Sequence, residues 1–367
     1  MITNRYVKNT WYAAAWEHEI ATAENKLART ICEQPLVFIR GESGDYFALD
    51  NRCCHRAAPL SIGRIEGDSI RCMYHGLLYN NKGKVTEIPG QDRISKNMCV
   101  RQYPVAVRGK MLWIWMGDPE LANEDDIIDF EPLNDTDNWR GFDQEAYLHY
   151  NANWLLIADN LADFSHVAFV HEQTLGGSES YAYESVVEDV ITEEDGVSLD
   201  RWHNNSNPPP FHCAVIDKEL HTQKVDRLNA VSLHVPGVFL MNTLFAPAGW
   251  DKEKNDRTVC HEYSNCQLMT PESWNTTHFF WNYLHNRDRD KPEVTETLRQ
   301  YLLAGFMEDK LFIEEQQILL AENEGFEPRL IGADQALNVF RKKWDARIKQ
   351  EMNESEAAAS SSTKAII

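Results

Sequence analysis

The chain has 367 residues and a formal net charge of −21 at pH 7. This length exceeds what one ordinary hydrophobic core supports, so we expect two domains. The acidic balance argues against nucleic acid or an anionic membrane as a partner, and no apolar run is long enough to span a bilayer. The N-terminal residues contain no signal-peptide core. The eight cysteines therefore favour reduced thiols or metal ligands in a cytoplasmic protein.

Residues 1–118 have the pattern of a small antiparallel β domain. Short runs with strand composition alternate with turn-like segments such as GESGD and NNKGK. The expected strands are 35–40, 46–50, 76–80, 84–88 and 110–116. Their close spacing indicates a compact, mainly antiparallel unit.

An acidic, helix-poor stretch after this region marks the boundary to a larger α+β domain over residues 119–349. The expected elements are helices over 153–173 and 293–323 and a strand-rich region over 185–283. The low-complexity segment 350–367 is expected to be a mobile tail without a function of its own.

Two short stretches of the β domain pair cysteine with histidine. RCCHR contains Cys53-x-His55. Sixteen residues later, RCMYHG contains Cys72-x2-His75. Two thiolates and two imidazoles can hold a structural zinc ion, or a Rieske [2Fe–2S] cluster in which two Cys bind one iron and two His bind the other. Zinc fingers usually place like ligands together, whereas each stretch here offers one of each kind, which favours the cluster. Cys54 adjoins His55 directly, so we interpret it as a bystander.

A second group of candidate ligands lies in the predicted helix over 153–173. Asp163 and His166 are three residues apart and would be neighbours on a helix surface. His171 can converge on the same point if the helix loosens there. Two histidines and one carboxylate form the facial triad of a mononuclear Fe(II) site with open positions for O2. Packed or exposed histidines are the simpler interpretation, and the upstream Cys/His motif favours the metal site.

The carboxylate ligand is predicted on the helix over 293–323. At ~100° per residue, Leu302 and Phe306 fall on one apolar stripe, and Asp309 lies about 20° from its edge. An acid at such a position must be paired or bound to a metal, so Asp309 is the predicted third ligand, with a salt-bridged Asp as the alternative. Glu308 lies off the stripe, and we expect it to face solvent.

The Cys/His region resembles the Rieske domain of the non-haem iron oxygenases throughout the stretch CCHRAAPLSIGRIEGDSIRCMYHGLLYNNKGKVTEIPG. Cys54 and Met73 stand where that family usually has proline. NW…DNLADFSH…H resembles the iron-binding helix of the same family. EDK…IE is similar to the stretch that supplies the acid ligand in vanillate- and dicamba-type demethylases. The resemblance covers roughly residues 7–345.

This resemblance implies an N-terminal antiparallel β Rieske domain, a C-terminal helix-grip domain and a head-to-tail homotrimer. It implies the terminal oxygenase component of a multicomponent enzyme, which uses O2 and NADH-derived electrons for mono-oxygenation and oxidative O- or N-dealkylation of an aromatic compound. An NADH-dependent reductase and a ferredoxin, or one combined reductase, would supply the electrons. In such an assembly Asp163 bridges a cluster histidine of one subunit to an iron histidine of the next, with Asn160 beside it.

Candidate substrate contacts are Asn242, Gln267 and His278, which lie in segments similar to those that face the iron in the family. Each is equally well explained as an ordinary strand residue. The sequence shows no arginine obviously placed to pair with a substrate carboxylate.

The charge of the chain is unevenly distributed. Residues 51–110, here called the basic segment, carry eleven basic and four acidic residues, so this segment is +7 and the rest of the chain is −28. A basic patch on an acidic protein attracts and orients an acidic partner. We therefore expect an acidic ferredoxin to dock beside the cluster at Arg52, Arg56 and Arg71, and a merely solvated set of loops is the alternative.

Three other functions stay open from the sequence. The same iron site would serve cis-dihydroxylation or ring hydroxylation. A Rieske electron carrier with a non-catalytic ligand-binding domain would have no use for Asp163, the two histidines and Asp309. A zinc-stabilised binding module would be colourless, so an absorption spectrum with iron and zinc analysis separates it from the others.

Overall fold

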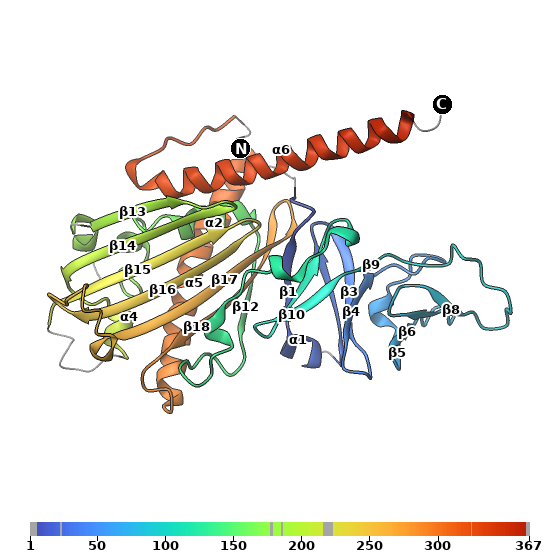
Figure 1. The fold of residues 1–367 in the computed structure, drawn as a ribbon, viewed down its shortest axis with the longest axis horizontal. Coiled ribbons are helices and arrows are strands. Elements are labelled where there is room, and N and C mark those ends of the chain that lie inside the picture. Colours follow the sequence, from blue (N-terminus) through green and yellow to red (C-terminus); the bar gives the residue numbers. More distant parts are fainter. Residues whose placement is uncertain are drawn as a thin grey trace. The chain divides into compact units, whose positions relative to one another are not determined.

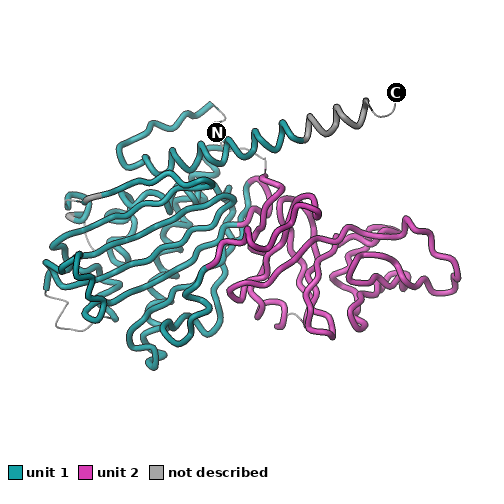
Figure 2. Tube along the Cα trace, viewed as in Figure 1, with its two compact units in different colours: residues 1–3, 130–269, 275–367 teal, residues 4–129, 270–274 magenta. Residues whose placement is uncertain are grey.

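The structure is a computed structural model that describes residues 6–22, 24–176, 179–184, 186–215, 223–323 and 325–364. The chain forms two compact units (Figure 2). Unit 2 consists of Asn4–Asp129 with the short segment Thr270–Trp274, and the rest of the chain belongs to unit 1. The sequence placed the boundary at residue 118, inside the acidic connection that precedes unit 1.

Unit 2 is built from three antiparallel sheets with the strand orders β1-β11-β10, β2-β3-β4-β9 and β5-β6-β7-β8. Its elements are β1 (Trp11–Trp16), α1 (Glu17–Thr22), β2 (Lys26–Ile31), β3 (Gln34–Arg40), β4 (Tyr46–Asp50), β5 (Arg64–Glu66), β6 (Ser69–Arg71), β7 (Leu78–Asn80), β8 (Val85–Glu87), β9 (Gln102–Tyr103), β10 (Val105–Arg108) and β11 (Met111–Trp115). All five strands expected in this region are present.

Strand β3 is buried on both faces, which explains its unbroken apolar run. Leu36 and Phe38 pack into one hydrophobic cluster with residues of β1 and β11. Val37 and Ile39 point the other way, into a second cluster that includes both Cys53 and Cys72. The two cysteines are therefore anchored in a hydrophobic core rather than on the surface.

Unit 1 is a seven-stranded antiparallel sheet in the order β12-β18-β17-β16-β15-β14-β13, with helices packed against it (Figure 1). Its strands are β12 (Ala146–Tyr150), β13 (Val186–Thr192), β14 (Gly196–Ser206), β15 (Val225–His234), β16 (Val238–Pro247), β17 (His261–Ser273) and β18 (Thr276–His285). Its helices are α2 (Trp154–Ala162), α3 (Val167–Val170), α4 (Pro210–Cys213), α5 (Pro292–Glu322) and α6 (Gln335–Lys364). The predicted α+β class and the long helix are confirmed, and the predicted helix over 153–173 is interrupted.

Helix α5 lies against one face of this sheet (Figure 1). Its buried face includes Leu302, Phe306 and Asp309, as the helical phase of the sequence predicts. The ring of Phe306 packs against Trp281 and Phe279 of β18, with ring centroids 4.9 and 5.2 Å apart. This packing holds the Asp309 carboxylate inside unit 1.

The C-terminal segment that we expected to be a tail is helical as far as Lys364, because α6 continues through it. Residues 365–367 lie outside the described residues. Nearer its start, α6 is joined to α2 by an ion pair in which Arg341 Nε donates to Asp159 Oδ1 at 2.9 Å. No helix in the described ranges combines the length and the apolar character that crossing a lipid bilayer requires.

Candidate metal centres and substrate cavity

The two Cys/His stretches form two loops of the same backbone design. In the first loop the N–H of Ala57 donates to the carbonyl of Cys53 at 2.9 Å, and the N–H of Cys53 donates to Ala58 O at 2.8 Å. In the second loop the N–H of Gly76 donates to Cys72 O at 2.9 Å, and the N–H of Cys72 donates to Leu77 O at 2.8 Å. Each cysteine is thus held at the start of a closed turn.

Both turns require a left-handed residue four positions after the cysteine. Ala57 has a φ of 56° and Gly76 a φ of 79°. Glycine is the residue that adopts this conformation at least cost. At Gly76 it is also required by space, since a Cβ there would lie 2.6 Å from Cγ of Pro89. The proline of the IPG stretch therefore closes over the second loop.

The four predicted cluster ligands divide into a buried and an exposed pair. Cys53 and Cys72 are buried. Burial raises the pKa of the Cys72 thiol, and the neighbouring Cys53 thiol acts in the same direction. His55 and His75 are exposed, and their rings lie 4.5 Å apart between centroids. Two thiols on the core side and two imidazoles on the solvent side fit a [2Fe–2S] cluster with one iron bound by each pair.

Tyr79 secures the inner side of the first loop. Its hydroxyl lies 3.0 Å from Cys53 Sγ and accepts a hydrogen bond from the N–H of Cys54 at 3.0 Å. The Cys54 side chain is exposed, and its Sγ lies 3.1 Å from the same hydroxyl. Hydrogen bonds to cluster thiolates are among the features that set the reduction potential of an iron–sulfur centre.

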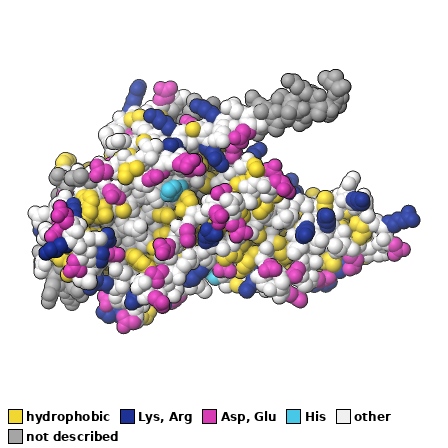
Figure 3. Space-filling view, in the orientation of Figure 1, with side chains coloured by type: hydrophobic (Ala, Val, Ile, Leu, Met, Phe, Trp, Pro, Cys, Tyr) yellow, Lys and Arg dark blue, Asp and Glu magenta, His cyan; other side chains and the backbone are white. Residues whose placement is uncertain are grey.

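The three arginines predicted to dock a partner differ in their surroundings. Arg52 and Arg56 are exposed. Arg71 is half-buried, pairs with Glu66 at 2.7 Å and Glu87 at 3.0 Å, and donates to the carbonyl of Gly76 at 2.8 Å. Arg71 therefore braces the second loop, and two acids balance its charge, so Arg52 and Arg56 are the exposed arginines of the predicted docking site. Figure 3 shows basic and acidic side chains interspersed over unit 2 on the face drawn.

The predicted mononuclear site begins where α2 ends. The helix starts at an Asn153 cap, whose side chain accepts from Leu155 N at 2.9 Å, and stops at Asp163, which is extended with φ −111° and ψ 116°. The Asp163 carboxylate accepts hydrogen bonds from Ser165 N at 2.6 Å and from Ser165 Oγ at 2.9 Å. Such local bonds compete with helical ones and end the helix. Asp163 and His166 therefore do not share a helix surface, contrary to the sequence-based interpretation.

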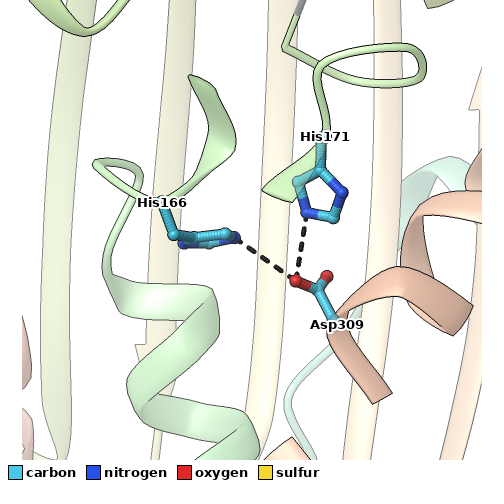
Figure 4. A group of neighbouring side chains, drawn as sticks. All are labelled: His166, His171 and Asp309. Atoms are coloured by element: carbon cyan, nitrogen blue, oxygen red, sulfur yellow. Dashed lines mark ion pairs between the residues drawn. The ribbon is translucent and has the colours of Figure 1, made fainter. Parts of the chain in front are cut away.

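This interruption lets His166 and His171 bracket the short helix α3 and point at one carboxylate (Figure 4). His166 Nε2 lies 3.5 Å and His171 Nε2 lies 3.0 Å from Asp309 Oδ1. The three potential ligand atoms all lie within 4.8 Å of one another. Two imidazoles and one carboxylate, with the remaining side open to a cavity, are the facial ligand set of non-haem Fe(II).

Other groups orient these ligands. Glu308 Oε2 lies 2.7 Å from His171 Nδ1 and accepts a hydrogen bond from Thr174 Oγ1 at 2.6 Å. This contact leaves His171 Nε2 as the atom that faces the metal position. Asn160 Nδ2 donates to Asp309 Oδ1 at 3.0 Å. The expectation that Glu308 only faces solvent is wrong, because the helix end at α3 brings His171 within its reach.

Burial and the neighbouring acids act in opposite directions on the two histidines. Burial lowers the pKa of His166 below its usual value, and the nearby Asp309 offsets only part of this effect. Burial also disfavours the charged form of His171, but Asp309 and Glu308 outweigh it and raise the pKa of His171. The site is thus electrostatically prepared for a cation, which would take the place of the proton.

A cavity of about 120 Å³ opens beside these ligands. An apolar cavity of roughly 150 Å³ accommodates benzene, so this one is close to the size of a single aromatic ring. The apolar part of its lining is formed by Leu161, Phe164, Val167, Leu175, Phe211, Phe239, Met241, Leu302 and Phe306. A small aromatic compound fits both the size and the character of this space.

Only one of the three predicted substrate residues reaches the cavity. Gln267 lines it. Asn242 is exposed on the opposite face of β16 and accepts a hydrogen bond from Ser264 Oγ at 2.5 Å. His278 is buried on the far face of β18, with Nδ1 2.8 Å from the Tyr147 hydroxyl. The predictions for Asn242 and His278 are wrong, because successive side chains of a strand point to opposite faces of the sheet.

Sequence reasoning missed several polar residues of the cavity, among them Arg227, His212 and Tyr283. The period-two pattern of VDRLNAVSLH places Arg227 on the same face as Asn229 and Val231, and this was the available signal. His212 and Tyr283 come from other segments, and only the folded sheet brings them to the same space.

The fold and the two ligand sets define a class of protein, the non-haem iron oxygenases with a Rieske cluster. Comparison with known families agrees with this class. Residues 10–104 match the Rieske [2Fe-2S] domain, and residues 150–350 match the vanillate O-demethylase oxygenase C-terminal domain.

Individual relatives match over nearly the whole chain. The iron-sulfur subunit of the toluene-4-sulfonate monooxygenase system of Comamonas testosteroni is 38% identical, over 94% of this chain and 98% of that protein. The oxygenase component of dicamba O-demethylase from Stenotrophomonas maltophilia is 30% identical, over 90% and 94%. The crystal structure of dicamba monooxygenase bound to 3,6-dichlorosalicylic acid superposes with a TM-score of 0.86 at 27% identity, over 95% of this chain and 99% of that one.

The chain therefore belongs to the Rieske non-haem iron oxygenases, in the group whose C-terminal domain is that of vanillate O-demethylase oxygenase. It is the oxygenase component of a multicomponent enzyme, with a [2Fe–2S] cluster and a mononuclear iron as its cofactors.

The contact between Glu308 and His171 yields a testable prediction. Glu308→Gln keeps the size of the side chain and removes the charge that orients His171, so the affinity of the mononuclear site for Fe(II) should fall about tenfold or more. The measurement is competition with a chelator after selective removal of the mononuclear iron, while the visible absorption of the cluster stays unchanged. Glu315→Gln, the same change at an exposed position of α5, is the control. Equal iron affinity in Glu308→Gln and the wild type would contradict the role of Glu308.

Proposed function

We propose that this oxygenase carries out oxidative O- or N-dealkylation, chiefly demethylation, of a small aromatic compound. The observation that carries the proposal is the mainly apolar, ring-sized cavity that His166, His171 and Asp309 all line. Two comparisons support it. The matching C-terminal domain is that of the vanillate O-demethylase oxygenase. The oxygenase component of dicamba O-demethylase is 30% identical to this chain.

The bound iron would supply the activation of O2, with electrons delivered from the cluster. His166, His171 and Asp309 would hold the iron through one face and leave the other side free. The apolar wall, including Phe306 and Leu302, would exclude water and hold the substrate ring with its alkyl group toward the ligands.

The dealkylation itself balances simply. Hydroxylation of a C–H bond next to oxygen or nitrogen places one atom of O2 in the product, and the other leaves as water after the uptake of two electrons and two protons. The hemiacetal or hemiaminal then breaks its carbon–heteroatom bond, and an aldehyde and a phenol or amine are released. A second candidate is hydroxylation without loss of carbon, which the 38% identity to a toluene-4-sulfonate monooxygenase subunit favours.

The proposed reaction is tested with 4-methoxybenzoate and 4-methoxybenzamide. The reconstituted enzyme with reductase, NADH and O2 should release formaldehyde and the matching phenol from at least one of them. Asp309→Ala should release none, while its cluster spectrum stays that of the wild type. The Asp309 carboxylate contacts His166, His171 and Asn160 of unit 1, whereas the cluster loops belong to unit 2. Mass spectrometry that finds hydroxylated product with the methoxy carbon retained, and no formaldehyde, would favour the second candidate instead.

We further propose that the protein is a head-to-tail homotrimer in the cytoplasm, in which Asp163 couples the iron site of one subunit to the cluster of the next. Two features support this role. His55 and His75 are exposed, so a neighbouring subunit can reach them. Within the described part of the chain, the Asp163 carboxylate accepts two hydrogen bonds, both from Ser165. A carboxylate has about four acceptor positions, so two remain for imidazole N–H groups.

Asp163→Asn tests this coupling. Both iron centres should assemble, but oxidation of the reduced cluster by O2 and substrate in rapid-mixing experiments should slow by about 100-fold or more, because an amide lacks the charge and the paired acceptors that hold two imidazoles. Ser165→Ala removes one donor to the same carboxylate and should keep a near-normal rate. Cluster oxidation at the wild-type rate in Asp163→Asn would rule out the bridging role.

The electron donor is the remaining partner. We propose that an acidic ferredoxin, reduced by an NADH-dependent reductase, docks at the exposed Arg52 and Arg56 beside the first cluster loop. The formal charge of +7 in the basic segment supports this placement on an otherwise acidic chain. The exposed side chains of Met73 and Tyr74 on the second loop would add apolar contact area.

Attraction of this kind is screened over about 10 Å at 0.1 M salt, so reduction of the cluster by ferredoxin should slow as salt rises. Arg52→Glu and Arg56→Glu should lower the second-order rate and flatten its salt dependence, whereas reduction by dithionite should not change. Arg289→Glu, the same charge change on an exposed arginine of unit 1, is the control. If the rate of cluster reduction by ferredoxin changes neither with salt nor with the two substitutions, these arginines are only solvated.

A further inference from the structure

Arg227 is a buried cation in the wall of the cavity. It lies on β15, only 4% of its surface is exposed, and it lines the same space as the three iron ligands. Burial lowers the pKa of the guanidinium to about 10, which still leaves it charged at neutral pH. Placing a charge in such surroundings costs free energy unless an opposite charge compensates it.

Within the described part of the chain, no carboxylate lies within ion-pair distance of Arg227. The adjacent Asp226 points to the other face of the strand and accepts hydrogen bonds from Asn205 N and Gly249 N, both at 2.8 Å. By contrast, Arg201 of the neighbouring strand pairs with Glu188 at 2.8 Å. The unpaired charge is therefore a feature of this position and not of arginines in this sheet.

The contacts that Arg227 does make position it without neutralising it. One terminal nitrogen donates to the Tyr181 hydroxyl. The guanidinium carbon lies 4.9 Å from the centre of the Tyr181 ring and 5.9 Å from that of Phe245. The Nε of Arg227 has no hydrogen-bond partner among the described residues. The planar guanidinium is thus held in place, while its Nε–H group donates to no described residue.

Two further buried donors of the same cavity are also unused. The Tyr283 hydroxyl and both ring nitrogens of His212 have no hydrogen-bond partner within the described ranges. Burial lowers the pKa of His212 well below its usual value, so the ring is neutral and offers one N–H. His212 is fixed by aromatic contacts, with its ring centroid 3.9 Å from that of Phe245 and 4.9 Å from that of Tyr263. Buried polar groups of folded proteins are almost always paired. Arg227 Nε can only donate, and the Tyr283 hydroxyl and the neutral His212 ring can each donate one hydrogen bond, so these groups indicate a missing acceptor. Gln267 Oε1 of the same cavity is also unpaired and can only accept, so it would need a separate donor.

We infer that Arg227 binds an anionic substituent of the substrate, a carboxylate or a sulfonate, with the Tyr283 hydroxyl and the His212 N–H as additional donors. The forked donors of a guanidinium match the oxygen atoms of either group. The inference rests on the proposed function only in that the cavity is taken as the substrate site. The substrate class is then an aromatic acid whose anionic end is held by β15 and β18, which leaves its other end for the iron ligands.

The test is binding of matched pairs of ligands, measured by calorimetry without O2 on the iron-loaded protein. The pairs are 4-methoxybenzoate with 4-methoxybenzamide, and 4-methoxybenzenesulfonate with 4-methoxybenzenesulfonamide. The wild type should bind the anion of at least one pair about tenfold or more tightly than its neutral partner, and the pair with the larger ratio identifies the carboxylate or the sulfonate as the preferred group.

Arg227→Met should lower the affinity for the preferred anion by about tenfold to 100-fold and change that for the neutral partner little, since a hydrogen bond to a charged group is lost. Arg227→Lys keeps the charge without the fork and should retain part of the preference. Arg201→Met is the matched control, because this arginine is paired with Glu188 and does not line the cavity. It should leave the preference unchanged.

Stability separates binding from a structural role. Because Arg227 has no acidic partner to strand, Arg227→Met should melt at or above the wild-type temperature, whereas a structural arginine would lower it. If Arg227→Met does not fold, Tyr283→Phe is the alternative variant, because it removes only one hydroxyl. It should lower the affinity for the anion several-fold more than the affinity for the neutral ligand.

A wild type without preference for either anion, or an Arg227→Met protein that keeps the preference, would overturn the inference. Its failure is distinct from that of the proposed function. Anion-selective binding without formaldehyde release would contradict dealkylation and leave the anion site standing. Formaldehyde release from the neutral amide, without any preference for the anion in binding, would support dealkylation and contradict the anion site.

Discussion

The position of the Asp309 carboxylate is the constraint on which unit 1 depends. An acid buried on the inner face of a long helix must be surrounded by groups that compensate it. Here these are two imidazoles and the Asn160 amide, and the metal would add the positive charge that they lack. The imidazoles can reach it only because α2 stops at Asp163 and the chain turns back into α3. The approach of the following loop to α5 depends on Gly305, where a Cβ would lie 2.7 Å from Cδ1 of Leu175.

The cluster loops of unit 2 depend on backbone conformation and not on a buried charge. Thiols buried beside β3 and imidazoles turned toward solvent require two closed turns of the same shape, and these turns require left-handed residues at Ala57 and Gly76. Arg71 then ties the second turn to two acids of the small sheet. A basic residue near a redox centre is thus not by itself evidence of a docking surface, since part of the positive charge of the basic segment is used within the unit.

Two charged residues near the iron site differ in how their charge is compensated. Glu308 is partly exposed and is paired with His171, so its charge acts on a proposed ligand of the metal. Arg227 is buried and has no acidic partner among the residues described, so its charge is available to the contents of the cavity. The pair of Glu308 with His171 supports a bound cation, whereas the unpaired positive charge of Arg227 favours a bound anion. The residues that could hold a metal and the proposed anion site are therefore different residues of one cavity.

The sequence by itself determined the features that depend on short-range spacing. The Cys-x-His and Cys-x2-His loops, the strand runs of unit 2 and the helical phase that buries Asp309 are all local, because a turn or a helix relates residues a few positions apart. The tertiary structure decided what depends on long-range pairing. The interruption at Asp163, the contact of Glu308 with His171 and the side of the sheet on which Asn242 and His278 lie followed from how distant segments meet. Arg227, His212 and Tyr283 come from three segments that share one cavity only after the sheet has formed, since the register that aligns them is set by contacts between strands and not by their order along the chain.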